Sequence, residues 1–161
     1  MPRHDRAVTV RIELPGRDPL ALEHVVLDVN GTLTDRGALA AGVSERMGRI
    51  TDRLDVHLLS ADTFGTLGAV ARELGVSAET IATGDDKAVL VRQLGAERCV
   101  AVGNGANDAA MLEVAAVGIA VVGPEGAAGA AVRAADVVCG SILDALDLLL
   151  DERALVATLR A

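Results

Sequence analysis

The segment over residues 28–34, Asp-Val-Asn-Gly-Thr-Leu-Thr, carries the residue types best suited to chemistry. Asp28 directly follows a short apolar run and leads into a Gly-Thr turn. A carboxylate at the end of a buried strand can attack phosphorus and divide one hydrolysis into two easier steps through an aspartyl phosphate. Gly31 lets the backbone approach a phosphate, and the amides around Val29 and Asn30 can point at its oxygens. The segment therefore predicts the nucleophile loop of a phosphoryl-transfer enzyme.

Three further polar groups follow along the chain. Ser60 ends the apolar run over residues 56–59 and offers a hydroxyl to a phosphate oxygen. Lys87 is the only lysine, against fourteen arginines, and a compact ammonium that pairs with a carboxylate and a phosphoryl oxygen is not freely replaced by a planar guanidinium. The glycine-rich loop over residues 103–108 ends in Asp108, an oxygen ligand suited to a hard cation such as Mg²⁺. Each group also has a structural interpretation as a strand end, a solvated lysine or a capped turn, but their order favours chemistry.

The elements that must position these residues follow a regular alternation. Short β-branched runs alternate with Ala/Leu-rich stretches of helical period, which is typical of a parallel sheet covered by helices. Gly75 and Gly95 are expected to end helices, and Thr83-Gly84-Asp85 is interpreted as a helix cap. Ligands bind at the carboxyl ends of such strands, where Asp28 and Ser60 fall. The expected strands cover 8–14, 25–29, 55–60, 76–82, 98–102, 118–122 and 136–139, and the expected helices cover 42–53, 63–74, 85–94, 107–115, 126–134 and a last element opening at Ser141.

Composition excludes several classes of function. With 161 residues, 51% of them apolar but only one Phe and no Trp or Tyr, the chain predicts one aliphatic core. A net charge of −8 opposes binding to nucleic acid or to an anionic membrane. Apolar runs fall short of the roughly 20 residues that span a bilayer, and no export signal is evident, so we expect a cytoplasmic protein that is not a transporter. Cys99 and Cys139 are expected to be reduced core cysteines.

From about residue 24 to residue 150, these motifs resemble the haloacid dehalogenase (HAD) superfamily in type and order. The stretch over residues 102–121, which contains Gly-Asn-Gly-Ala-Asn-Asp, looks most like the phosphorylation domain of P-type ATPases and its small soluble relatives. The resemblance implies an α/β fold with three layers, Rossmann-like, around a central and mostly parallel sheet. The intervals between motifs leave no room for a cap domain. We expect one domain over residues 1–161, with residues 1–23 as a short strand and turn extension.

The resemblance also implies roles for individual residues. It makes Asp28 and Lys87 catalytic, with a phosphoaspartyl intermediate on Asp28. The implied phosphate-binding residues are Val29, Asn30, Ser60 and Lys87, and the implied Mg²⁺ ligands are the Asp28 carboxylate, the backbone carbonyl of Asn30, and the side chains of Asn104 and Asp108.

Two positions depart from the family pattern. Phosphatases of this superfamily usually have Asp where this chain has Asn30, and their acidic motif usually begins Gly-Asp where this chain has Gly103-Asn104. The first change removes the acid that protonates the leaving oxygen and activates water, a role worth about 10² to 10⁴ in rate. The second removes a negative charge near the cation. We therefore expect slow dephosphorylation.

Three functions remain open at this point. The first is a slow Mg²⁺-dependent phosphatase or phosphotransferase that acts through Asp28. The second is a regulatory module that keeps a phosphate pocket without useful turnover. The third is a capless sugar-phosphate phosphatase, which the Leu33-Thr34-Asp35 continuation suggests. The expected partner is a phosphorylated small molecule or macromolecule, or a second copy of the chain, and not nucleic acid or a membrane.

Overall fold

A parallel sheet forms the centre of the protein, whose computed structural model describes residues 9–61 and 65–161. All pairings within the sheet are parallel. Its strands, in spatial order, are β10 (Val137–Cys139), β9 (Val117–Val121), β8 (Cys99–Gly103), β3 (His24–Asp28), β6 (Asp55–Ser60) and β7 (Ser77–Thr80).

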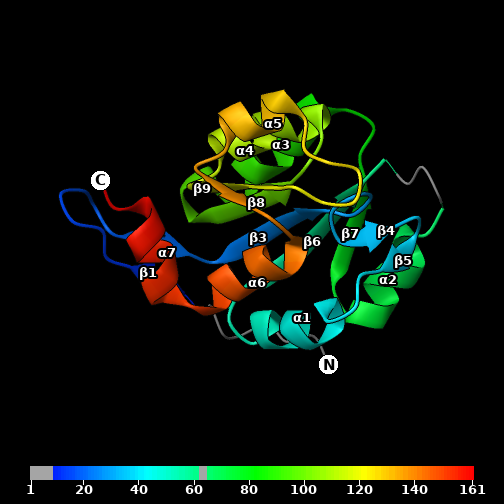
Figure 1. Cartoon of the computed structure of the whole chain (residues 1–161), viewed down its shortest axis with the longest axis horizontal. Helices are drawn as coiled ribbons and strands as arrows, with labels where there is room; N and C mark the ends of the chain where they lie inside the picture. The colour runs from blue at the N-terminus through cyan, green and yellow to red at the C-terminus, as the bar shows by residue number, and fades with distance from the viewer. Residues whose placement is uncertain (1–8, 62–64) are drawn as a thin grey trace.

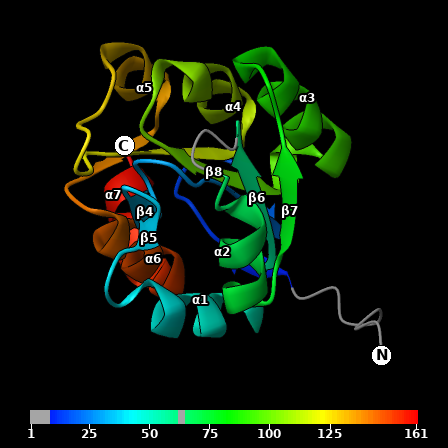
Figure 2. The ribbon, with the colours of Figure 1, turned by 90° about the vertical axis from the view of Figure 1, so that its right-hand side faces the viewer.

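Helices cover both faces of the sheet, so the protein has three layers (Figures 1 and 2). One layer contains α1 (Val43–Thr51), α2 (Leu67–Leu74) and α6 (Ile142–Leu150), and the other contains α3 (Gly84–Leu94), α4 (Ala109–Val114) and α5 (Gly129–Ala134). Strand β3 is apolar on both sides because alternate residues face opposite layers. Val25 and Leu27 pack with the α1 side, whereas Val26 packs with the α3 side.

Two small hairpins flank the sheet. Strands β1 (Val10–Ile12) and β2 (Leu20–Leu22) pair antiparallel, which agrees with the predicted strand and turn at the N-terminal side, and β1 lies beside α7 (Glu152–Leu159) (Figure 1). Strands β4 (Thr34–Asp35) and β5 (Ala38–Leu39) form the second hairpin, immediately after the Asp28 loop. Arg36 and Gly37 turn it with φ of 53° and 87°. The sequence interpretation did not include this second hairpin.

Most predicted elements are confirmed, and the differences lie at element ends. Strand β6 has the predicted bounds. The helix expected over 63–74 is α2, which begins at Leu67, and residues 62–64 lie outside the described residues. The helix expected over 107–115 begins as a 3-10 turn, η2 (Ala106–Asp108). The helix expected from residue 126 begins only at Gly129, because Gly123 and Gly126 close a turn before it.

The predicted helix caps are present. Thr83 Oγ1 accepts from the Asp86 N–H at the start of α3, and Ser141 Oγ accepts from the Asp144 N–H at the start of α6. Gly75 ends α2 in the left-handed conformation. The last element is two helices rather than one, because Asp151 ends α6 and its side chain caps α7.

The described residues leave no inserted domain between the strands. Only the β4–β5 hairpin and α1 lie between β3 and β6, and α2 and β7 precede Lys87, as a capless fold requires. Cys99 and Cys139 are buried and free, as predicted. Across the described ranges, 9–61 and 65–161, no helix combines the length and apolarity needed to cross a membrane.

Candidate functional site

The residues with predicted chemistry meet at one edge of the sheet. Asp28 ends β3, Ser60 ends the neighbouring β6, and Gly103 ends β8 on the other side of β3. Lys87 reaches the same edge from the first turns of α3. Carboxyl ends of adjacent parallel strands lie side by side, so segments far apart in sequence converge here.

Lys87 joins two buried carboxylates. Its Nζ donates to Asp28 Oδ1 at 2.9 Å and to Asp108 Oδ1 at 2.7 Å. Only 1% of the Lys87 side chain and none of the Asp108 side chain is exposed. The Asp28 side chain is 9% exposed, so Asp28 is the member of the two ion pairs that is most open to solvent, and we refer to Asp28, Lys87 and Asp108 as the buried triad.

Burial and charge shift the titration of the triad. Burial, together with the negative charge of Asp108, raises the pKa of Asp28 to about 6, although Lys87 and the Thr32 hydroxyl act in the opposite direction. Burial alone would lower the pKa of Lys87, but the two carboxylates more than offset this and raise it. Lys87 thus stays protonated, and Asp28 is ionised at neutral pH.

Close backbone packing holds the Lys87 helix against the acidic loop. A Cβ on Gly84, the first residue of α3, would lie 2.5 Å from the backbone oxygen of Asn107. A real Cβ does not tolerate that separation, so glycine is required for α3 to approach η2 this closely. This contact sets the position from which Lys87 reaches Asp108.

Asp108 also organises its own loop. Its Oδ2 accepts from the backbone N–H groups of Asn104, at 3.0 Å, and Gly105, at 2.9 Å. A Cβ on Gly103 would lie 2.5 Å from the Asp108 carboxylate. Since its Oδ1 already binds Lys87, both oxygens of Asp108 have protein partners. The interpretation of this loop as a capped turn is therefore confirmed for Asp108, and its predicted role as a Mg²⁺ ligand stays a prediction.

Thr32 connects Asp28 to the acidic loop, a contact that sequence reasoning did not foresee. The Thr32 Oγ1 lies 3.2 Å from Asp28 Oδ2 and 3.1 Å from Asn104 Oδ1. A hydroxyl has one hydrogen to donate, so two acceptor oxygens converge on a single donor. One of them is available to a second donor or to a cation.

Asn30 and Ser60 form a second contact at the site. Asn30 Nδ2 donates to Ser60 Oγ at 3.0 Å. The Val29 N–H, by contrast, donates to the Leu59 carbonyl at 3.2 Å, so in this structure it extends the pairing of β3 with β6. The backbone N–H groups around Val29 and Asn30 are predicted to bind phosphate oxygens. The N–H of Val29 is already used in this hydrogen bond within the protein.

The turn between β9 and α5 also reaches the site, although its sequence carries no recognised motif. A Cβ on Gly123 would lie 2.5 Å from the Gly31 carbonyl oxygen, and a Cβ on Gly31 would overlap Glu125 Oε2. Asn104 Nδ2 donates to the Gly126 carbonyl at 3.2 Å. The Gly-Pro-Glu-Gly turn thus packs directly on the Asp28 loop.

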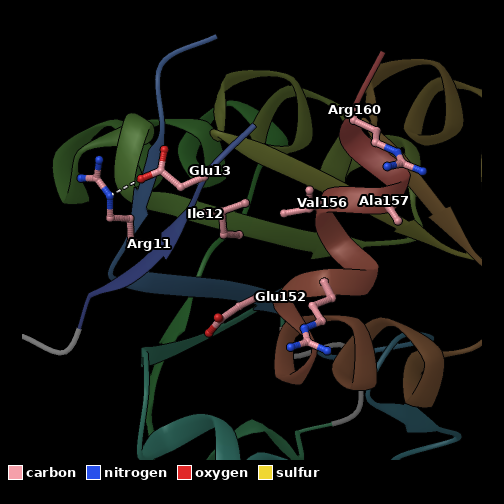
Figure 3. A pocket seen from close by; sticks show the side chains of 8 residues that line it. Arg11, Ile12, Glu13, Glu152, Val156, Ala157 and Arg160 are labelled. Atoms are coloured by element: carbon pink, nitrogen blue, oxygen red, sulfur yellow. Dashed lines mark hydrogen bonds and ion pairs between the residues drawn. The ribbon is translucent and has the colours of Figure 1, made fainter. Parts of the chain in front are cut away.

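Separate hollows lie on different parts of the molecule. One, of about 320 Å³, adjoins the Asp28 loop and is lined by Thr32, Thr34, Pro124, Ser141 and Leu143, among others. Another lies between β1 and α7, where Figure 3 shows Ile12 of β1 pointing toward Val156 of α7, with the Arg11–Glu13 ion pair on the far side of Ile12. Only the first borders residues of the predicted site.

The oxygen atoms at the site suit a hard cation. Asp28 Oδ2 and Asn104 Oδ1 converge on the Thr32 hydroxyl, and Mg²⁺ prefers such carboxylate and carbonyl oxygens while keeping several waters. The described part of the chain contains no group of three His, Cys, Asp or Glu side chains placed to hold a metal. The oxygen atoms named above are of the kind that Mg²⁺ prefers.

Solved structures show which class of protein this fold defines. A putative HAD family hydrolase from Streptomyces avermitilis is similar with a TM-score of 0.66 and 22% identity, over 80% of this chain and 84% of that one. The 3-deoxy-D-manno-octulosonate 8-phosphate phosphatase of Moraxella catarrhalis, solved with magnesium, phosphate and a KDO molecule, has a TM-score of 0.63 and 18% identity, over 86% and 94%. The chain has the HAD fold, as predicted.

The predicted likeness to P-type ATPases is also confirmed. A zinc-transporting PIB-type ATPase in its E2·Pi state matches with a TM-score of 0.62 and 26% identity. The match covers 75% of this chain but only 20% of the ATPase. The likeness is thus limited to a small part of that transporter.

Two proteins of one organism are similar to this chain in sequence. Uncharacterized protein MJ0073 of Methanocaldococcus jannaschii is 47% identical over 64 residues, which cover 40% of this chain and 69% of that protein. Uncharacterized protein MJ0072 of the same organism is 41% identical over 39 residues, which cover 24% and 89%. The chain belongs to the same family as these proteins. No family model matches it.

Proposed function

We propose that this chain is a Mg²⁺-dependent hydrolase of phosphate monoesters that uses Asp28 as its nucleophile. The observation that supports this most strongly is the buried triad, which holds an ionised carboxylate at a strand end beside a permanent cation. The phosphatases that share its fold support the same class of reaction.

The geometry suggests a role for each polar atom. Asp28 Oδ1 attacks phosphorus, and the new bond forms as the ester oxygen leaves with its electron pair. Lys87 Nζ uses two of its three hydrogens on Asp28 and Asp108, so the third can bind a phosphoryl oxygen. Asn30 Nδ2 donates one hydrogen to Ser60 and has a second for the same purpose. Water then attacks phosphorus, the bond between phosphorus and Asp28 Oδ1 breaks, and inorganic phosphate leaves as the Asp28 carboxylate is regenerated.

Mg²⁺, when bound, would offset the negative charge of the phosphoryl group. Its ligands would be Asp28 Oδ2, the Asn30 carbonyl and Asn104 Oδ1. Asp108 contributes in a different way, because both of its oxygens already have partners. It holds Lys87 and the acidic loop in place.

Asn30 makes the reaction slow. An amide cannot donate a proton to the leaving oxygen, which must take it from water, and cannot activate the water that attacks the aspartyl phosphate. General acid–base groups are worth about 10² to 10⁴ in rate. We propose that both the formation and the hydrolysis of the phosphorylated intermediate are therefore slow.

Trapping with beryllium fluoride tests the nucleophile. Wild-type protein with Mg²⁺ should form a stable adduct, seen by fluorine NMR, that is absent in Asp28→Ala. A thermal unfolding measurement shows that the variant is folded. An adduct of equal occupancy in Asp28→Ala would disprove the nucleophile assignment.

Substitution of Asn30 tests the slow step. Asn30→Asp should raise phosphatase turnover by about tenfold or more, because it restores an acid of the kind that contributes 10² to 10⁴. Asn30→Ser is a matched control that restores no acid. Equal or lower turnover in a folded Asn30→Asp protein would show that Asn30 has another role.

Two alternative functions each rest on a specific observation. Neutral side chains at Asn30 and Asn104 favour a phosphate-binding regulatory module, which would bind beryllium fluoride but give no multiple turnovers. The fold of the solved 3-deoxy-D-manno-octulosonate 8-phosphate phosphatase favours a sugar-phosphate phosphatase. A panel of phosphate esters with Mg²⁺ distinguishes them, because turnover on sugar phosphates but not nucleotides supports the latter.

The proposal also covers the class of partner, the cellular location and the assembly of the protein. The net charge of −8 favours a phosphorylated small molecule or macromolecule over nucleic acid or a membrane surface. We place the protein in the cytoplasm, and without a cap domain the site has room for a second copy of the chain to cover it.

A further inference from the structure

The candidate cation site is short of negative charge. Asn104 is neutral, and Asp108 has both oxygens engaged by Lys87 and by backbone N–H groups. Of the predicted metal ligands in the described ranges, the Asp28 carboxylate remains to face a cation, and Lys87 already pairs with it. Mg²⁺ sites in proteins usually contain one or two carboxylates, so a second carboxylate would strengthen binding here.

Glu125 is a carboxylate that lies beside the Asp28 loop. Its Oε2 contacts Gly31 so closely that a Cβ on that glycine would overlap it, and the same Cβ would lie 3.0 Å from Asn104 Nδ2. The Glu125 carboxylate and the Asn104 amide therefore lie on the same side of the Asp28 loop. Gly31, with φ of 75°, leaves the space that Glu125 Oε2 occupies.

The turn that carries Glu125 is attached to the site on both sides. Asn104 Nδ2 donates to the Gly126 carbonyl at 3.2 Å, and the Asn104 carbonyl accepts from the Ala128 N–H at 2.8 Å. Gly126 N–H donates to the Gly123 carbonyl at 2.9 Å and closes the turn. The backbone at Glu125 is thus held by the acidic loop, while its exposed side chain stays open to solvent and ions.

We propose that Glu125 is a ligand of the site's divalent cation and supplies the carboxylate that Asn104 lacks. The inference rests on the proposed function in one respect, that a divalent cation binds beside Asp28. It assigns to the β9–α5 turn a part in metal binding.

Metal binding without substrate tests this assignment. Isothermal titration calorimetry of MgCl₂ into the full chain should show that Glu125→Gln weakens the affinity by about tenfold or more, as removal of a metal-site partner does elsewhere. Glu113→Gln, at an exposed glutamate of α4, removes the same charge and should leave the affinity unchanged. Equal affinity in wild type and Glu125→Gln, equal losses in both variants, or no Mg²⁺ binding by wild type would overturn the proposal.

A second variant asks whether Glu125 replaces the missing acid. Asn104→Asp in the Glu125→Gln background puts a carboxylate back at the same side of the loop and should restore the Mg²⁺ affinity. Failure of this rescue in a folded double variant would count against the replacement. Beryllium fluoride trapping separates the two proposals: a Glu125-dependent affinity without an adduct on Asp28 refutes the hydrolase, and an adduct with unchanged affinity in Glu125→Gln refutes the Glu125 assignment.

Discussion

Strand β3 bears ionisable side chains at both of its ends, and the two ends manage charge differently. At its carboxyl end, Asp28 is 6% exposed and pairs with Lys87. At its amino end, His24 Nδ1 lies 3.2 Å from His57 Nε2, and the Asp55 carboxylate lies 3.8 Å from the same His24 nitrogen. The carboxyl end pairs the opposite charges of Asp28 and Lys87. The amino end brings together the imidazoles of His24 and His57, which repel each other when both are protonated.

The pKa shifts follow from these partners. Burial raises the pKa of Asp28 to about 6, and the carboxylates raise that of Lys87. Burial, together with His24, lowers the pKa of His57. The carboxyl end therefore stays charged at neutral pH and depends on the pairing, while His57 at the amino end avoids charge by staying deprotonated. Comparison of the two ends shows that burial alone does not predict whether a site carries charge.

Removal of Lys87 should have the largest effect on stability. Lys87→Met leaves two buried carboxylates without their cation, which costs about 3–5 kcal/mol when a buried pair loses one partner. Urea denaturation measures the loss. Arg92→Met, at an exposed position on the same helix, should change stability by less than about 0.5 kcal/mol.

A double variant shows whether uncompensated charge is the cause. Asp28→Asn with Lys87→Met leaves only Asp108 buried and charged, and Asp108 keeps its two backbone donors. The double variant should be more stable than Lys87→Met alone. If it is less stable, the cost arises from lost packing and the contrast between the two ends of β3 is weaker than stated.

A pair of glycine substitutions tests the contact that positions Lys87. Gly84→Ala places a Cβ 2.5 Å from the Asn107 oxygen and should destabilise by about 1–3 kcal/mol, as overpacking does. Gly48→Ala, in α1, meets nothing within 4 Å and should stabilise by about 0.8–1 kcal/mol through helix propensity. Thermal unfolding compares the two. Stabilisation by both would mean that α3 can shift freely relative to the acidic loop.

The smallest expected effect is on how the stability of the fold changes as the pH falls, to which His57 and Asp28 contribute with opposite signs. Because the folded-state pKa of His57 is below its ordinary value of 6.5, its contribution to stability is complete above pH 6.5 and is lost as pH falls below it. The raised pKa of Asp28 has the opposite sign, since the folded state binds more protons than the unfolded state between pH 3.8 and about 6.

Variants at each end separate these two responses. Relative to wild type, the decline in stability on acidification should be smaller in His57→Gln and larger in Asp28→Asn. Urea midpoints across this pH range measure both. The same pH dependence in both variants would contradict the comparison between the two ends.

Much of the fold could be predicted from local sequence. Strand β6 was predicted with its correct bounds because an apolar run ends in a single polar residue, Ser60. The β4–β5 hairpin escaped prediction because each strand has two residues, too few to show alternation. The start of α5 was misplaced because Gly123 and Gly126 close a turn that periodicity does not reveal. The break between α6 and α7 had a local signal, Asp151 followed by an acidic residue, that was not used.

The sequence by itself determined that Asp28 and Ser60 stand at strand ends, because strand ends follow from local patterns of apolar and polar residues, and the order of the motifs predicted that Lys87 and Asp108 join them. Only the tertiary structure decided what each side chain contacts there. Thr32 connects Asp28 with Asn104, the Val29 amide extends the sheet, and Glu125 contacts Gly31 from a turn far along the chain. These contacts join segments distant in sequence, and their geometry depends on how closely the strands and turns pack.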